Sequence, residues 1–140
     1  DRIGRKKLLL GCSAVMGLCM LLIGGWLVSK NVDKDRVLIT VFVYIAAFAC
    51  TWGAVLWVYV AEIFPNKIRG SATSFAIFGN WTANAIVSFT FPVMLSDLGA
   101  PLTFFIYGIV NIGMIFFVAR YVFETKGVEL EKMEELYAAV

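Results

Sequence analysis

Asparagine side chains within an uncharged stretch are the clearest candidates for binding a polar ligand. Asn80 and Asn84 are four residues apart, so on a helix they point the same way, and Ser88 continues the stripe. Amides that faced lipid would be left without hydrogen-bond partners, so the stripe must face other helices or a wet cavity. An amide offers both donors and acceptors, which suits a ligand bearing many hydroxyl groups. Hydrogen bonding between helices, without a ligand, explains the stripe equally well.

A glycine and a tryptophan form a second candidate position. Gly53 and Trp57 are also four residues apart and share a helix face. A tryptophan ring at membrane depth beside a glycine can stack on the apolar face of a sugar ring. Packing or anchoring at the membrane surface is the simpler explanation of these two residues alone, and it is the only role predicted for Trp26 and Trp52.

Charged residues gather in short turns at the ends of the uncharged stretches. Moving Glu62 to the middle of a bilayer would cost roughly 2.5–3.5 kcal/mol, so we expect it at the interface, in an ion pair, or both. Arg69 in the next turn, and Arg5 and Lys6 near the start of the chain, are its candidate partners. Such a network can bias a protein that alternates between two conformations. For the bases in residues 1–7, the alternative role is a simple basic anchor on the membrane surface.

Several kinds of chemistry find no support in the sequence. The chain has no histidine, and its three cysteines lie inside uncharged stretches without a metal-binding spacing. These stretches contain no acid and no pair of nucleophile and base, so we expect no catalytic residue, no metal and no cofactor. The bases lie beside the uncharged stretches, so the net charge of +2 does not indicate nucleic-acid binding.

The elements that must position these residues are four long stretches without Asp, Glu, Lys or Arg. They are 22, 25, 26 and 22 residues long and cover 8–29, 37–61, 71–96 and 98–119. At ~1.5 Å per residue, 22 helical residues reach ~33 Å, the thickness of a bilayer's hydrocarbon core. We therefore predict an all-α membrane protein, a fragment of a larger one. The four predicted spans and the hydrophilic tail are approximately 8–29, 37–64, 71–96, 102–122 and 123–140.

The distribution of bases predicts the orientation in the membrane. Nine Lys and Arg residues occur in 1–7, 65–70 and 120–140, against three in 30–36 and 97–101. Because cytoplasmic loops carry an excess of bases, we expect the first group on the cytoplasmic side of the cell membrane. Both ends of the chain would then be cytoplasmic.

Four motifs in order along the chain resemble those of the sugar porters of the major facilitator superfamily. They are Asp-Arg-Ile-Gly-Arg-Lys at 1–6, Glu-Ile-Phe-Pro at 62–65 with Arg-Gly at 69–70, Asn-Trp at 80–81 with Asn84, and Glu-Thr-Lys-Gly at 124–127. The resemblance implies helices nine to twelve of a twelve-helix transporter. Trp57 with Gly53 would then lie near the sugar, with Asn80 and Asn84 beside its hydroxyls. A charged network would hold the cytoplasmic side closed, formed by Arg5, Lys6, Glu62, Arg69 and Glu124.

The expected function is transport of a monosaccharide by alternating access, as a facilitator or a proton symporter. The expected partners are the sugar, with or without a coupled proton, the lipid bilayer and the remaining helices. A sugar sensor that does not transport, or a transporter of a polyol or other small polar solute, is the alternative. Sensors tend to carry a long tail, and the 20 residues after Arg120 favour transport.

Two positions depart from the sugar-porter pattern. Ala54 stands where the family usually has proline after the glycine, which predicts a softer helix break there. Phe123 stands where proline often precedes Glu-Thr-Lys-Gly, which leaves the last helix free to run into the tail. Pro92 is expected to kink or end the third span.

Overall fold

The computed structural model describes residues 4–29, 33–64 and 67–124 of the 140-residue chain. All regular secondary structure in these ranges is helical. The helices are α1 (Arg5–Val28), α2 (Lys34–Cys50), α3 (Val55–Ile63), α4 (Arg69–Asp97) and α5 (Ala100–Tyr121). Residues 125–140 lie outside the described ranges. They include the last three residues of the Glu-Thr-Lys-Gly motif and nearly all of the predicted tail.

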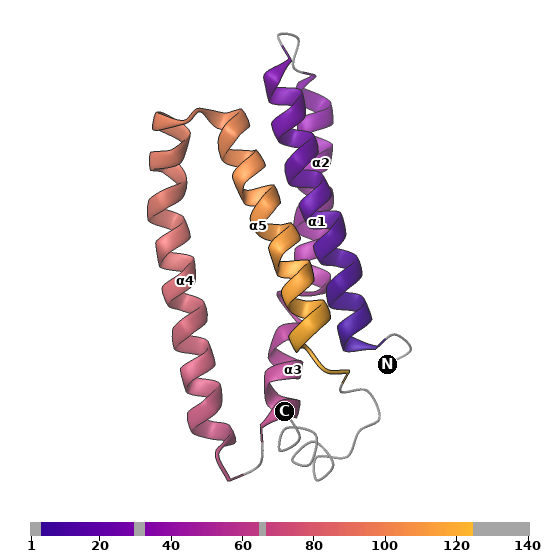
Figure 1. The fold of residues 1–140 in the computed structure, drawn as a ribbon, viewed down its shortest axis with the longest axis vertical. Coiled ribbons are helices and arrows are strands. Elements are labelled where there is room, and N and C mark those ends of the chain that lie inside the picture. The colour runs from indigo at the N-terminus through magenta and orange to yellow at the C-terminus, as the bar shows by residue number, and fades with distance from the viewer. Residues whose placement is uncertain (1–3, 30–32, 65–66, 125–140) are drawn as a thin grey trace.

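Close packing of α1 against α5 forms the centre of the fold, and α2 packs on another side of α1 (Figure 1). Small residues let the two backbones approach closely. A Cβ added at Gly108 of α5 would lie 2.6 Å from Leu21 Cδ2 of α1. A Cβ added at Gly24 of α1 would lie 3.2 Å from the Pro101 carbonyl oxygen of α5. Larger side chains here would push the helices apart.

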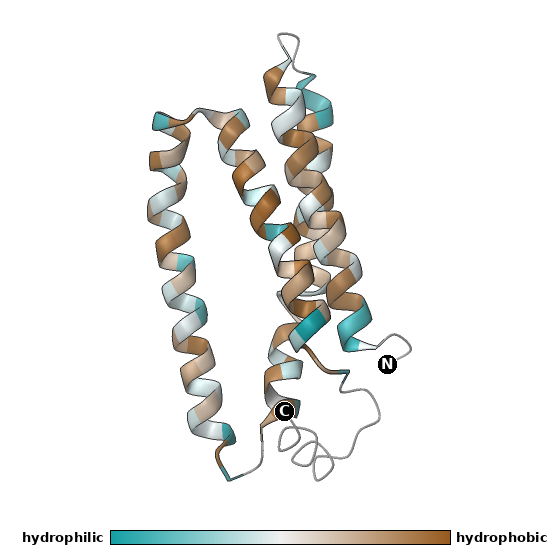
Figure 2. Cartoon of the chain, viewed as in Figure 1, coloured by the Kyte–Doolittle hydropathy of each residue, from teal (hydrophilic) through white to brown (hydrophobic). Residues whose placement is uncertain are grey.

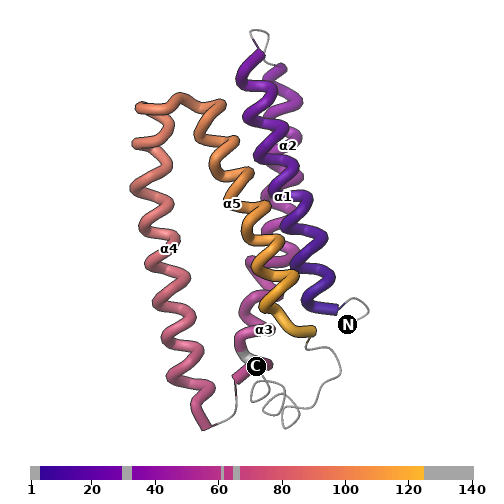
Figure 3. Tube along the Cα trace, in the orientation of Figure 1, coloured from indigo at the N-terminus to yellow at the C-terminus, as the bar shows by residue number. Residues whose placement is uncertain are grey.

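Helix α4 stands apart from this centre and joins it through a tight turn to α5 (Figures 1 and 3). Gly99 makes the turn with φ +78°, a conformation that glycine adopts at little cost. No residue of α4 is buried within the described structure, and its exposed aromatic side chains include Phe75, Phe78 and Phe89. Pro92 lies inside α4 and does not end it.

The second predicted span is divided into two helices by a break at 51–54. The Gly53 N–H donates to the Phe48 carbonyl oxygen at 2.9 Å, and the Val55 N–H donates to the Thr51 carbonyl oxygen at 2.6 Å. Thr51 is fully buried, and its hydroxyl bonds the Ala47 carbonyl oxygen. The chain thus forms this break with Ala54 in place of proline.

Among the described residues, three segments are long and apolar enough to cross a membrane: Arg5–Val28, Lys34–Val60 and Ala100–Tyr121, with mean hydropathies of 2.2, 2.0 and 2.2. Figure 2 shows more hydrophilic colour along α4, which at 29 residues has ample length but carries many Thr, Ser and Asn side chains. The expectation that the last helix runs into the tail is wrong. Helix α5 ends at Tyr121, and Val122 is already extended.

Candidate functional site

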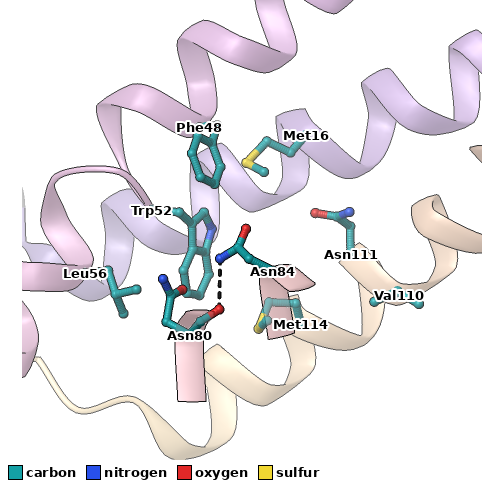
Figure 4. Close-up of a pocket in the computed structure, with 9 residues that line it drawn as sticks. All are labelled: Met16, Phe48, Trp52, Leu56, Asn80, Asn84, Val110, Asn111 and Met114. Carbon is teal, nitrogen blue, oxygen red and sulfur yellow. Dashed lines mark hydrogen bonds between the residues drawn. The ribbon is translucent and has the colours of Figure 1, made fainter. Parts of the chain in front are cut away.

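A cavity of about 230 Å³ lies between the helices and brings together side chains from all five of them and from the break (Figure 4). It is mainly apolar with a few amides, the composition typical of a small-molecule site. Its lining residues are Met16, Phe48, Trp52, Leu56, Asn80, Asn84, Val110, Asn111 and Met114.

Three asparagines supply the polar surface of this cavity. Asn84 Nδ2 donates to the backbone carbonyl oxygen of Asn80, and Asn111 Nδ2 donates to the backbone carbonyl oxygen of Tyr107, each at 2.9 Å. These bonds leave both Oδ1 atoms as acceptors. The side-chain amide of Asn80 bonds no other residue in the described ranges, so its donors and its acceptor are all available. Together the three amides can bind hydroxyl groups from more than one side.

One tryptophan forms an aromatic wall of the cavity, and it is Trp52. Its indole Nε1 donates to Ser13 Oγ of α1 at 2.9 Å, which ties the break between α2 and α3 to α1. Trp57 has 38% of its surface exposed and does not line this cavity, and neither does Gly53. The binding roles of Trp57 and Gly53 therefore stay predictions.

The structure places part of the predicted charged network in contact at one end of the helices. Arg5 Nη2 lies 2.8 Å from Glu62 Oε1, and the two side chains are 22% and 30% exposed. The Arg5 backbone N–H donates to Glu124 Oε1 at 2.8 Å. Lys6 Nζ donates to the Ala119 carbonyl oxygen at 2.8 Å. Arg5 thus joins α1 to the end of α3 and to the segment after α5.

Three further contacts lie at this end of the helices. A Cβ at Gly4 would overlap the Glu124 carboxylate, so glycine lets the carboxylate reach the first N–H of α1. The Phe123 N–H donates to the Tyr59 hydroxyl at 3.3 Å, which ties the chain after α5 to α3. Arg69, the remaining predicted member, donates from Nε to the Phe64 carbonyl oxygen at 3.3 Å across the turn before α4.

Comparison with known proteins identifies the family. The sequence model of the sugar (and other) transporter family matches residues 1–137. The chain belongs to this family. It is 41% identical over 137 residues to the D-xylose transporter of Levilactobacillus brevis, covering 96% of this chain and 30% of that relative. It is 36% identical over 143 residues to the D-xylose-proton symporter of Escherichia coli K12, covering 98% of this chain and 29% of that relative.

A solved structure shows the same arrangement of helices. The inward-open xylose transporter XylE from E. coli matches with a TM-score of 0.91 and 38% identity, covering 97% of this chain and 30% of that one. The predicted all-α fold of the major facilitator superfamily is confirmed, and the family is one of transporters, not enzymes. The chain spans about 30% of the length of these transporters.

A relative with a different activity also matches. The high glucose sensor RGT2 of Saccharomyces cerevisiae is 34% identical over 146 residues, covering 98% of this chain and 19% of the sensor. Transporters and at least one sensor therefore share this segment.

Proposed function

We propose that the full-length protein containing this segment moves a monosaccharide across the cell membrane by alternating access, in symport with a proton. The cavity lined by Asn80, Asn84, Asn111 and Trp52 is the observation that carries this proposal. Amides that can both donate and accept suit the hydroxyls of a sugar, and an indole face suits its C–H groups. Relatives named as D-xylose transporters make D-xylose the first substrate to test.

The proton pathway belongs outside this segment. The four uncharged stretches contain no Asp, Glu, Lys or Arg, and the chain contains no histidine. A proton carrier inside the membrane requires an ionisable group there. We therefore expect the coupling carboxylate in helices beyond these, while this segment supplies sugar contacts.

Uptake into proteoliposomes tests the function. Purified full-length protein should accumulate labelled D-xylose when an inward proton gradient is applied, and sugar addition should acidify the lumen. Sugar binding without uptake would contradict transport and support the sensor. Uptake without proton movement would contradict symport. Uptake of a polyol with no uptake of D-xylose would reassign the substrate.

The proposed orientation places the Arg5–Glu62 end on the cytoplasmic side. The start of α1, the end of α3, the start of α4 and the end of α5 all lie at this end of the molecule (Figure 1). Nine of the twelve Lys and Arg residues occur in the sequence segments next to these helix ends, and an excess of bases is typical of the cytoplasmic side. Cysteine substituted at Asp97 should react with an impermeant maleimide on intact cells, and cysteine at Lys67 should not. Labelling of Lys67→Cys from outside would reverse the orientation.

A further inference from the structure

A single hydrogen bond links the break at 51–54 to the middle of α1. Trp52 Nε1 donates to Ser13 Oγ at 2.9 Å, and Ser13 is fully buried. We propose that Ser13 is a positioning residue for the sugar site, because its hydroxyl fixes the Trp52 ring as the aromatic wall of the cavity. This inference rests on the proposed function, and it adds to it a residue that does not itself line the cavity.

The position of Trp52 in the chain explains why its ring needs such a tie. It lies between α2 and α3, where the backbone leaves the regular helical pattern. Its ring can adopt several rotamers about its two side-chain torsions, so backbone position alone does not set its direction. The indole N–H is a donor without acceptor capacity, and in apolar surroundings it must find an acceptor. The Ser13 hydroxyl is that acceptor, and it selects one ring orientation.

This orientation matters for a sugar because the ring is not uniform. Its faces carry partial negative charge and its edge partial positive charge. Figure 4 shows the ring among the cavity side chains, with Asn80 and Asn84 beside it. The N–H edge is directed to α1, so the rest of the indole is held toward the cavity. A ring released from Ser13 would present different atoms to a sugar held by the same amides.

Ser13→Ala and Trp52→Phe test the bond from its two sides. Ser13→Ala removes one buried oxygen and adds no volume, and Trp52→Phe keeps an aromatic ring without the donor. In full-length protein, Ser13→Ala should raise the KM for D-xylose uptake about three- to tenfold, the range of one neutral hydrogen bond. The maximal rate and the membrane abundance should stay unchanged. In the Trp52→Phe background, Ser13→Ala should change the KM less than twofold, because the shared bond is already gone.

Thr103→Val is the matched control. Thr103 is also fully buried, but its hydroxyl bonds the Gly99 carbonyl oxygen of its own helix end at 2.9 Å, and it does not line the cavity. Its removal should leave the KM unchanged. An unchanged KM in Ser13→Ala would overturn the positioning role. So would an equal fold-change in KM on Ser13→Ala in the unmodified protein and in the Trp52→Phe background.

A spectroscopic readout tests the tie independently of transport. Protein labelled with 5-fluorotryptophan gives a fluorine resonance for Trp52, assigned by its loss in Trp52→Phe. Ser13→Ala should shift or broaden this resonance, and Thr103→Val should not. An unshifted Trp52 resonance would overturn the inference even if sugar transport is confirmed. A shifted resonance in a protein that moves no sugar would instead contradict the proposed function alone.

Discussion

Polar side chains within the helices differ in where their hydrogen bonds go. Thr82 and Thr90 bond carbonyl oxygens one turn back on α4, and Asn111 does the same on α5. Such bonds satisfy the hydrogen-bonding capacity of a polar side chain within its own helix, so the side chain needs no partner on another helix or on a ligand. Asn80 differs, because its amide bonds no residue in the part of the chain that the structure describes. This places Asn80 foremost among the candidate ligand contacts.

The sequence predicts two of the three cavity amides, Asn80 and Asn84, and misses the cavity tryptophan, and one rule of helix geometry explains both outcomes. Asn80 and Asn84 lie on an unbroken helix, where a spacing of four residues places them on one face. The same rule predicts that Trp57 shares a helix face with Gly53, but Gly53 lies in the break, where that rule does not apply. The break instead turns Trp52 toward α1 and the cavity. Asn111 is the only asparagine in 98–119, so no spacing within that stretch marks it as part of a site.

At the scale of elements, Arg5 connects three segments that the sequence separates widely. Its side chain bonds Glu62 at the end of α3, and its backbone bonds Glu124 after α5. The family resemblance predicts a charged network that includes these residues, and in the structure Arg5 contacts both Glu62 and Glu124. Their role as a gate that holds the cytoplasmic side closed stays a prediction, and a charge-reversal cycle tests it.

Glu62→Arg should place two positive charges in contact and favour the inward-open state. Transport should fall, and reagents should reach the cavity more readily from the cytoplasmic side. Arg5→Glu should act in the same direction. The double mutant restores an opposite pair, and since a partly exposed pair contributes about 1 kcal/mol, transport should recover roughly fivefold relative to either single mutant.

Labelling rates and uptake, measured in protein of equal membrane abundance, decide the outcome. Lys67→Glu is the control, because Lys67 is an exposed charge in the turn after α3. It should change neither rate by more than about twofold, as expected for surface charges. Strictly additive losses in the double mutant would remove Arg5 as the partner of Glu62 in the gate.

At the scale of the molecule, the uncharged stretches predict most of the fold. Stretches of 22 to 26 residues without charge predict membrane helices, and the short turns between them predict the hairpin connections. The geometry of the break at 51–54 could not be predicted from Ala54, because the hydrogen bonds of the break depend on Thr51 and Phe48. The end of α5 could not be predicted from Phe123, since Glu124 and Tyr59 hold the following residues in contacts distant in sequence.

The cavity lies where all five helices of the described structure meet, since each of them contributes a side chain to its lining. We propose above all that this cavity binds the sugar. Binding of D-xylose to purified full-length protein, measured by calorimetry, tests this claim without depending on transport. The decisive variant is Asn80→Ala, with Thr82→Ala as control, because Thr82 is on the same helix, bonds its own backbone and does not line the cavity.

Asn80→Ala should weaken D-xylose binding by about 1–3 kcal/mol, the usual cost of leaving hydrogen-bonding groups unpaired away from water. This corresponds to a Kd about 5- to 150-fold higher, while Thr82→Ala should bind as the unmodified protein does. Equal affinity in folded Asn80→Ala and unmodified protein would contradict sugar binding in this cavity and place the sugar site elsewhere.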